Sequence, residues 1–268
     1  MIATPTALHL QAAVLAAEAG CALLLEKPIS HSLDGVDRLQ AAVRQTGSRV
    51  LAGFQFRFHP SLVRAAQILS DGELGRIMSA HVHYGEYLPA WHPWEDYRHG
   101  YAARADLGGG VLLTQCHSLD YLPWLVGEVE AVWGLLAKSS DLEIDVDDTA
   151  EIGLRFSGGA LATLHLDYAQ QPPSHHFHVS GTRGFLQCDL LSGLVRVYRP
   201  ETKAWTDYPL PENWERNVMF QEEMKHFLAV VRREAQPACT LDDGLRVMRL
   251  IAAVQDSQRT GQLVSLKP

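Results

Sequence analysis

The chain has 268 residues, of which 47% are hydrophobic and 20% charged, so it has enough apolar material for one large or two modest domains. Its formal net charge of −8 argues against a nucleic-acid partner and against binding to an anionic membrane surface. The four cysteines lie far apart without C-x-x-C spacing, and no leader-like or membrane-length apolar run is recognisable, so we expect a cytoplasmic protein without disulfides.

The first part of the chain, residues 1–75, alternates strand and helix patterns. Three strand-like residues precede Thr4, a suitable N-cap, and a helix predicted over 7–19. A strand at 22–25, a helix at 33–45, a strand at 50–54 and a helix at 61–69 follow. This alternation is typical of an α/β domain with a parallel sheet, in which ligands bind beyond the carboxyl ends of the strands.

The remainder, residues 76–268, shows the alternating pattern of half-buried strands in an antiparallel sheet. One long helix is predicted over 110–126, and two more over 217–233 and 241–259. This α+β part is expected to pack one sheet face on helices. The other face, which carries Leu161, Thr163, His165 and Asp167, would face solvent or an interface.

Lys27 is the first candidate for chemistry, because it follows a predicted buried strand in the segment LLLEKPIS. A partly desolvated amine at a strand end has a lowered pKa and can hold or donate a proton near neutral pH. Pro28 would restrict Lys27 to an extended conformation. The alternative is a solvent-exposed lysine paired with Glu26.

His117 is the second candidate. On the predicted helix, Thr114, His117 and Tyr121 share one stripe, and Asp120 lies three residues after His117. A histidine oriented by a carboxylate is a competent general base for a hydroxyl proton. The alternative is a buried structural histidine that is hydrogen-bonded to Asp120.

The stretch WHPWEDYRHGYAAR mixes aromatic faces with hydrogen-bonding groups, a mixture suited to binding a polyol. It holds Trp91, Trp94, Asp96, Tyr97, Arg98 and Arg104, of which Trp94, Tyr97 and Arg98 are the candidate substrate-binding residues. The alternative is an aromatic loop that only covers the core.

Two pairs of histidines, His81 with His83 and His176 with His178, alternate along predicted strands and therefore share a face. No carboxylate or thiolate stands at a matching spacing, so we predict ordinary histidines and no metal site.

Five motifs occur in one order over nearly the whole chain: ATPTALH at 3–9, EKPIS at 26–30, GFQFRFHP at 53–60, GGGVLL at 108–113 and LDYLPWLVG at 119–127. Together they resemble the glucose-fructose oxidoreductase and inositol dehydrogenase family (Gfo/Idh/MocA), whose members are NAD(P)-dependent sugar and cyclitol dehydrogenases. The resemblance implies an incomplete Rossmann-type parallel sheet followed by an open antiparallel β-sheet domain with helices on one face. That sheet often forms a dimer or tetramer interface in the family.

The resemblance also implies roles for individual residues. The family's E-K-P lysine lies beside the nicotinamide and the reacting hydroxyl, and a histidine after the glycine run accepts the proton; these roles fall on Lys27 and His117. NAD or NADP would be bound by Thr4, Pro5, His9, Glu26, Lys27, Pro28, Gln55 and Arg57. A sugar-like substrate would contact Lys27, Trp94, Tyr97, Arg98, Thr114 and His117.

Two features depart from the family. Thr114 stands where the family usually has an aspartate three or four residues before the histidine, which leaves Asp120 to replace it. No G-x-G-x-x-G occurs, so the phosphate-binding turn is missing from these 268 residues. Met1 occupies a strand position where the family often has valine, and our hypothesis is that the sequence is a truncated copy of a longer enzyme.

Three functions are compatible with these patterns. The leading one is an NAD(P)-dependent oxidoreductase acting on a CH–OH group of a sugar, cyclitol or nucleotide-sugar, inactive as this truncated chain. The second is a catalytically silent relative that acts as a sugar-binding or dimerisation module. The third is an NAD-assisted lyase or glycosidase. A titration of the chain with NAD(H) separates the first two, and we expect no useful binding.

Overall fold

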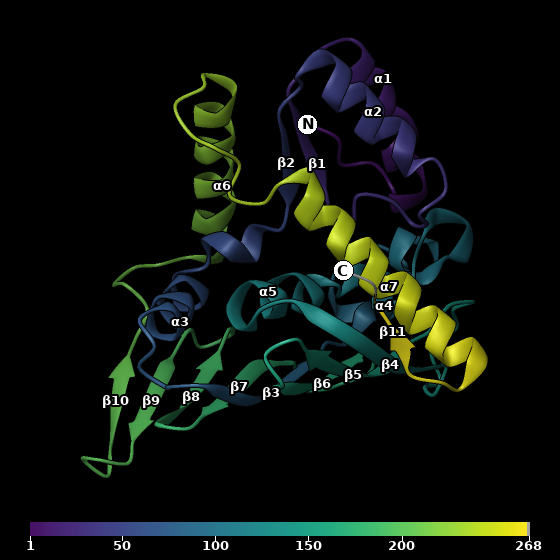
Figure 1. Ribbon diagram of the computed structural model, residues 1–268. Coiled ribbons are helices and arrows are strands. Elements are labelled where there is room, and N and C mark those ends of the chain that lie inside the picture. The colour runs from purple at the N-terminus through teal and green to yellow at the C-terminus, as the bar shows by residue number, and fades with distance from the viewer. Residues whose placement is uncertain (267–268) are drawn as a thin grey trace.

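The structure is a computed structural model that describes residues 1–266, and it contains two β layers joined by helices (Figure 1). The N-terminal part comprises α1 (His9–Glu18), β1 (Leu23–Glu26), α2 (Val36–Thr46), β2 (Val50–Gly53), the 3₁₀ turn η2 (Gln55–Phe58) and α3 (Pro60–Ser70). The helices of the remainder are α4 (Val111–Thr114), α5 (His117–Val126), α6 (Arg216–Val231) and α7 (Leu241–Thr260). Its strands are β3 (Ile77–Gly85), β4 (Val129–Ala137), β5 (Thr149–Phe156), β6 (Leu161–Asp167), β7 (Ser174–Gly181), β8 (Gly184–Asp189), β9 (Val195–Arg199), β10 (Ala204–Tyr208) and β11 (Val264–Ser265).

The small sheet is parallel, as the alternation of strands and helices predicted. Strands β1 and β2 pair in parallel, and Ile2 forms a parallel bridge to Leu25. The apolar run of β1 is buried because α1 packs against this strand, while α6 and α7 pack against β2. Burial on both faces accounts for the absence of polar alternation in this strand. The α/β prediction for this part is confirmed.

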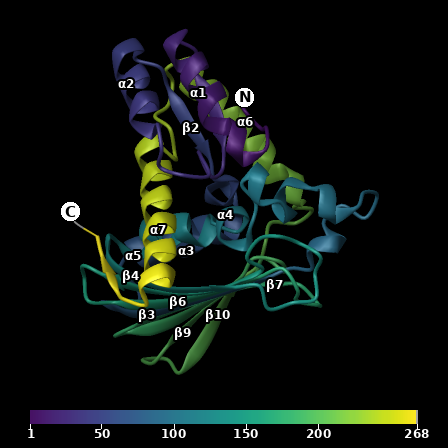
Figure 2. The same cartoon turned by 90° about the vertical axis from the view of Figure 1, so that its right-hand side faces the viewer.

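The large sheet has nine strands in the order β10-β9-β8-β7-β3-β6-β5-β4-β11. Figures 1 and 2 show the helices above one face of this sheet and none below the other, which confirms the open sheet with helices on one face. The sheet is not wholly antiparallel, because β3 and β6 pair in parallel. After β3 the chain crosses through α4 and α5 to β4, and the meander β4-β5-β6 then returns to β3 running in the same direction.

Two local predictions were wrong. The helix expected over 110–126 is divided into α4 and α5 at Gln115, whose φ of −97° and ψ of 25° are not helical. Thr4 caps no helix, because the first turn begins at Thr6 and the Thr4 carbonyl instead contacts the ring of His9.

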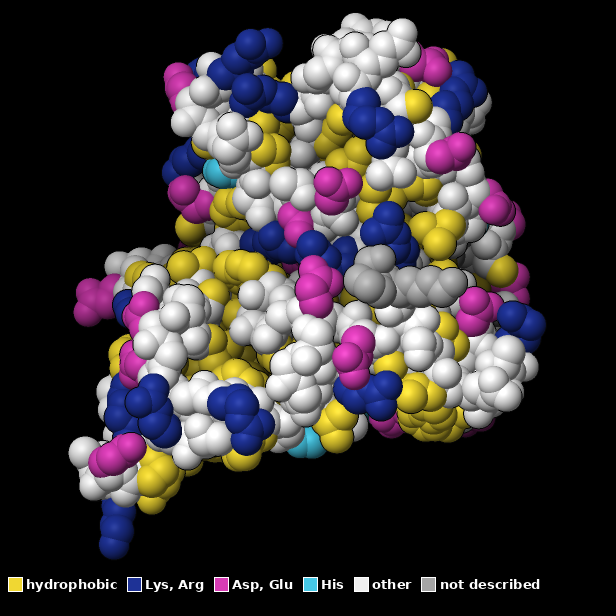
Figure 3. Space-filling view, viewed as in Figure 1, with side chains coloured by type: hydrophobic (Ala, Val, Ile, Leu, Met, Phe, Trp, Pro, Cys, Tyr) yellow, Lys and Arg dark blue, Asp and Glu magenta, His cyan; other side chains and the backbone are white. Residues whose placement is uncertain are grey.

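The C-terminal helices connect the two β layers. The backbone N–H of Ala52 in β2 donates to the carbonyl of Cys239, just before α7, at 3.0 Å. Helix α7 packs on β2 and on β4, so it runs from the small sheet to the large one (Figure 1). Acidic and basic side chains are interspersed over the face shown in Figure 3. Within residues 1–266, no helix combines the length and apolar character required to cross a membrane.

Candidate functional site

A cavity of about 470 Å³ lies where the two layers meet. Lys27 reaches it from the end of β1, Gln55 from the turn after β2, and Thr114 and His117 from α4 and α5. The carboxyl ends of the two parallel strands therefore deliver Lys27 and Gln55 to one place, as expected for such a sheet. The other residues that line it include Tyr84, Glu86, Tyr87, Trp91, His92, Tyr101, Gln171, Pro172, Pro173 and Arg216.

Lys27 points its amine across the layers, and Nζ donates a hydrogen bond to the carbonyl oxygen of Thr114 at 2.7 Å. Burial lowers the pKa of Lys27, but the nearby Tyr101, Cys116, Glu26 and Glu86 outweigh it, and the pKa is raised. The expectation of a lowered pKa is thus wrong. An amine with a raised pKa stays charged at neutral pH, so it can donate hydrogen bonds but cannot accept a proton.

His117 is buried, and its ring makes edge-to-face contacts with the rings of Phe54 and Phe56. Its Nε2 lies 3.5 Å from Nε2 of Gln55, whereas Nδ1 has no hydrogen-bond partner among residues 1–266. Burial, followed by the charges of Lys27, His175 and Arg216, lowers the pKa of His117 well below its usual value. A neutral imidazole in a cavity can accept a proton from a ligand hydroxyl.

Asp120 does not orient His117. Its carboxylate accepts two hydrogen bonds from Arg57, at 2.9 Å from Nε and 2.7 Å from Nη2, and both side chains are buried. Arg57 also donates to the carbonyl of Ala238 at 2.6 Å. The sequence paired Asp120 with His117 either as a general base and its orienting carboxylate or as a structural hydrogen bond. Both pairings are wrong, because the carboxylate is bound by Arg57 of η2. Thr114 offers no substitute, since its hydroxyl donates to the carbonyl of Gly110 at 2.8 Å.

The aromatic loop reaches the cavity through Trp91, which the sequence analysis named, but not through the three residues predicted to bind substrate. Trp94 is 79% exposed, and Arg98 pairs at the surface with Asp96 and Glu143. The Tyr97 hydroxyl accepts from the backbone N–H of Glu143 at 3.1 Å. The structure does not bring these three predicted residues into the cavity. In their place it brings Trp91, His92 and Tyr101.

Sequence reasoning missed two charged cavity residues, Glu86 and Arg216. Glu86 directly follows β3, so the rule that ligands gather at strand ends could have found it. Arg216 begins α6, far along the chain, and no local pattern marks it.

The residues predicted for the cofactor separate into two groups. His9 contacts the carbonyl oxygens of Thr4 and Pro28, each at 2.8 Å, and so connects the segment after the Ile2 bridge to the loop after β1. The Glu26 carboxylate accepts from the backbone N–H of Lys27 at 3.3 Å. Lys27 and Gln55 line the cavity, whereas the lining does not include Thr4, Pro5, His9, Glu26, Pro28 or Arg57.

These residues fit only one end of a dinucleotide. The charged amine of Lys27 and the cavity beside it suit a nicotinamide ring and a hydroxyl ligand. Across residues 1–266, no glycine-rich turn joins a strand to a helix N-terminus in the way that binds a pyrophosphate.

Comparison with known proteins gives concordant matches along the chain. Residues 62–187 match the family described as GFO/IDH/MocA C-terminal domain, and residues 1–54 match the oxidoreductase family with an NAD-binding Rossmann fold. The uncharacterized oxidoreductase YrbE of Bacillus subtilis is 30% identical over 275 residues, which cover 99% of this chain and 77% of that protein. The chain belongs to the Gfo/Idh/MocA oxidoreductase family.

Other members of the Gfo/Idh/MocA family are equally extensive matches. The D-xylose 1-dehydrogenase (NADP(+)) 2 of Haloferax volcanii is 25% identical and covers 99% of this chain, which spans 79% of that enzyme. The structure of a levoglucosan dehydrogenase in complex with NADH and levoglucosan superposes with a TM-score of 0.89 at 21% identity, over 100% of this chain and 80% of that one. The family cofactor is NAD(P), and relatives include sugar dehydrogenases.

Proposed function

We propose that the cavity binds a sugar, cyclitol or nucleotide-sugar and that the protein acts in its NAD(P)-dependent oxidation or reduction at a CH–OH group. The observation that carries the proposal is the meeting of Lys27 and His117, from distant parts of the chain, in one cavity with aromatic and charged walls. A concave site in which aromatic faces meet convergent polar groups is a typical ligand site. NAD(P), when bound, supplies the hydride acceptor or donor.

Lys27 and His117 have complementary roles in this proposal. The ammonium of Lys27, aimed by its hydrogen bond to Thr114, donates to the reacting oxygen and stabilises negative charge there. The neutral imidazole of His117 takes the hydroxyl proton. Trp91 and Tyr101 supply flat faces for the ring of the ligand, and Glu86 and Arg216 can bind its other hydroxyls.

A catalytically silent binding protein is the second candidate, favoured by one specific observation. No carboxylate orients His117, whose Nδ1 is buried without a partner among the described residues. A base that lacks such an orienting group loses catalytic power, but the cavity keeps its binding groups.

Tryptophan fluorescence tests ligand binding directly, because Trp91 lines the cavity and Trp94 does not. Titration with a panel of monosaccharides and cyclitols should produce a saturable change for at least one of them. Trp91→Phe should remove the signal and Trp94→Phe should keep it. Lys27→Met should weaken binding at least tenfold, whereas Lys225→Met, at an exposed ion pair, should leave it unchanged. Equal binding by both lysine variants would refute the site.

Formation of NAD(P)H with the bound ligand then distinguishes the two candidates. Turnover that His117→Ala abolishes supports the oxidoreductase. Ligand binding without turnover supports the silent relative only at a concentration of NAD⁺ or NADP⁺ at which a separate titration shows that the chain is saturated with cofactor. We expect these 268 residues to bind NAD(H) weakly, and tight binding in a titration would contradict that expectation.

We also propose that the protein self-associates through the outer face of the nine-stranded sheet and resides in the cytoplasm. Trp133, Leu135 and Leu161 on this face are 37%, 50% and 56% exposed, and burying them against a second copy would stabilise a dimer or tetramer. All four cysteines are free thiols, as expected in a reducing compartment.

Sedimentation velocity tests the association. Leu161→Asp should shift the protein to a smaller species, because a charge on the interface is desolvated without a partner. Leu228→Asp, on the exposed side of α6, is the control and should leave the oligomeric state unchanged. A wild-type protein that sediments as a monomer at high concentration would refute the proposal.

A further inference from the structure

A group of potential metal ligands lies on the outer face of the large sheet, away from the helices. Strands β3 and β6 pair in parallel with His83 opposite His165 and Gly85 opposite Asp167. Because residues two apart on a strand share a face, all these positions lie on the same side of the sheet. The pairing of β3 with β6 thus brings the carboxylate of Asp167 close to His83, for which the sequence showed no carboxylate at a matching spacing.

Gly85 makes room for this carboxylate. A Cβ atom at Gly85 would collide with Oδ2 of Asp167 and with Oε1 of Gln170. The missing side chain therefore lets both oxygen atoms fold over β3 beside His83.

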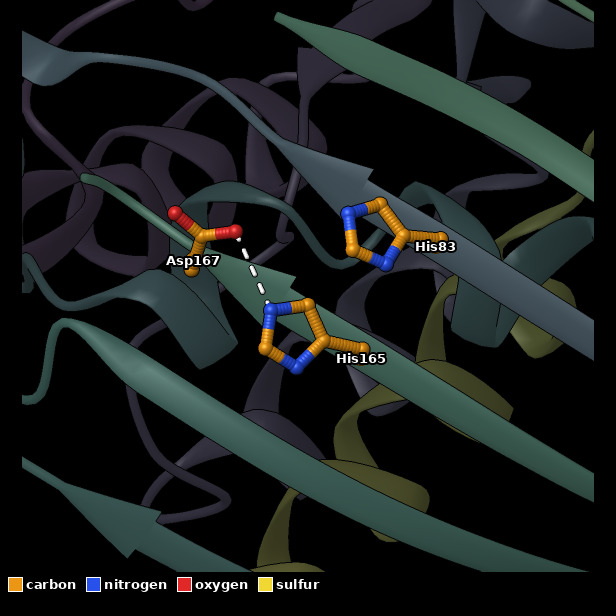
Figure 4. A group of neighbouring side chains, drawn as sticks. All are labelled: His83, His165 and Asp167. Atoms are coloured by element: carbon orange, nitrogen blue, oxygen red, sulfur yellow. Dashed lines mark hydrogen bonds and ion pairs between the residues drawn. The ribbon is translucent and has the colours of Figure 1, made fainter. Parts of the chain in front are cut away.

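The geometry suits a small cation. One ligand atom from each of His83, His165 and Asp167 can be chosen so that all three lie within 4.8 Å of one another. Figure 4 shows the two imidazole rings side by side, with one nitrogen of each on the side of the Asp167 carboxylate. In a tetrahedral zinc site the ligand atoms stand roughly 3.4 Å apart, which small side-chain rotations would reach.

The surrounding contacts orient the three ligands. Nδ1 of His165 is hydrogen-bonded to Glu151 at 2.6 Å, which directs Nε2 toward Asp167 at 3.1 Å. A carboxylate on the far nitrogen of a histidine is the usual support for a metal-binding imidazole. The other oxygen of Asp167 accepts from the backbone N–H groups of Ala169 and Gln170 at 2.8 and 2.6 Å, which fixes the carboxylate.

We propose that His83, His165 and Asp167 form a binding site for one divalent transition-metal ion, with the Gln170 amide oxygen, which contacts His83, as a further oxygen ligand. Two imidazoles and one carboxylate favour zinc, nickel, copper or iron over calcium and magnesium, which prefer oxygen ligands only. The ion would tie β3 to β6 just before the segment 168–173, whose Gln171, Pro172 and Pro173 line the cavity. Its role is therefore to hold a wall of the cavity, not to take part in the reaction.

Isothermal titration of the metal-free chain with ZnCl₂ tests the proposal. We expect one ion per chain with micromolar affinity or better, and a rise in melting temperature on zinc addition. His83→Ala and Asp167→Asn should each weaken binding at least tenfold. His81→Ala is the matched control, because His81 lies two residues earlier on the same strand and face and should have no effect.

Co²⁺ loading provides a readout that is independent of stability. The wild type and His81→Ala should show the visible absorption of cobalt bound by nitrogen and oxygen ligands, and His83→Ala should not, although its circular dichroism remains native. Three results would overturn the proposal: substoichiometric binding, equal loss in the His81 control, or unchanged affinity in both ligand variants. In each case His165 only bridges Glu151 and Asp167 by hydrogen bonds, without a metal.

Discussion

Lys27 and His117 line the same cavity, but the lysine is held in its charged form and the histidine in its neutral form. Tyr101, Cys116, Glu26 and Glu86 raise the pKa of Lys27 against the effect of its burial, whereas burial and nearby cations lower the pKa of His117. The two residues are also coupled, because the lysine charge is the largest contribution to the histidine shift after burial.

Lys27→Met should raise the pKa of His117. The substitution removes a positive charge that disfavours the imidazolium, while the burial of the ring is kept. Titration of the His117 ring signals by nuclear magnetic resonance measures the effect. Lys225→Met, at an exposed site, is the control. An unchanged pKa in Lys27→Met would show that the two groups do not share a cavity.

Glu223 on α6 is buried, and its Oε1 has no partner among residues 1–266. Burial and then the charge of Glu26 raise the pKa of Glu223 to about 8. The folded protein therefore binds more protons than the unfolded chain between the ordinary value of 4.5 and about 8, so the contribution of Glu223 to stability is complete below this window and is lost as pH rises through it.

Glu223→Gln should flatten this part of the pH profile. At pH 8 the variant should be more stable than the wild type by about 1–3 kcal/mol, because the amide carries no charge into the interior. Urea denaturation at pH 5, 6.5 and 8 provides the measurement. Glu222→Gln, at an exposed position next in sequence, should keep the wild-type profile. If stability varies with pH in the same way in Glu223→Gln and in the wild type, the raised pKa of Glu223 is contradicted.

At the scale of elements, the contact between β4 and α7 depends on a residue without a side chain. A Cβ atom at Gly134 in β4 would lie 2.7 Å from Cγ1 of Val254 in α7. The backbone N–H of Gly134 also donates to Ser257 at 3.0 Å. The helix can therefore lie directly on the strand, which positions one end of α7.

Gly134→Ala should destabilise the protein by about 1–3 kcal/mol, because the added methyl group overpacks this contact. Gly158→Ala is the control: it adds the same atom where nothing lies within 4 Å, and its backbone is not left-handed. Thermal or urea unfolding compares the two. Equal stability of both variants would mean that α7 shifts away from β4 at little cost.

At the scale of the whole molecule, Arg57 and Asp120 join three distant segments. Arg57 follows β2, Asp120 belongs to α5, and the contacts of Arg57 with Ala238 and Asp243 add the start of α7. Both side chains are buried, and the pair connects the turn that carries Gln55 to the helix that carries His117.

Asp120→Ala should cost about 3–5 kcal/mol, because it leaves the buried guanidinium without its partner. The double variant Arg57→Met with Asp120→Leu should be more stable than either single variant, since no charge remains buried. Asp106→Ala breaks an exposed arginine pair and should have no measurable effect. Urea denaturation compares these variants with the wild type, and a small loss for Asp120→Ala would contradict a structural role for the pair.

Local patterns in the sequence were sufficient for the class of each part of the chain and for individual buried strands. The apolar run of 22–25 indicates a strand buried on two faces, and the alternation in EAVWGLLA (130–137) indicates a strand buried on one face. The structure confirms both strands. The GGGVLL segment predicted a helix but not its interruption at Gln115, where the side chain donates to the carbonyl of Asp167 at the end of β6. Such contacts are not encoded in a periodicity.

The sequence by itself determined the family, the parallel and open sheets, and the position of Lys27 at a strand end, because these depend on motifs and local burial. Only the tertiary structure decided which side chains share a site. In the structure, Asp120 pairs with Arg57 and not with His117, and Trp91 rather than Trp94 lines the cavity. Asp167 lies beside His83. Each of these choices depends on contacts between residues far apart in the chain, whose relative positions are fixed only when the sheets and helices pack together.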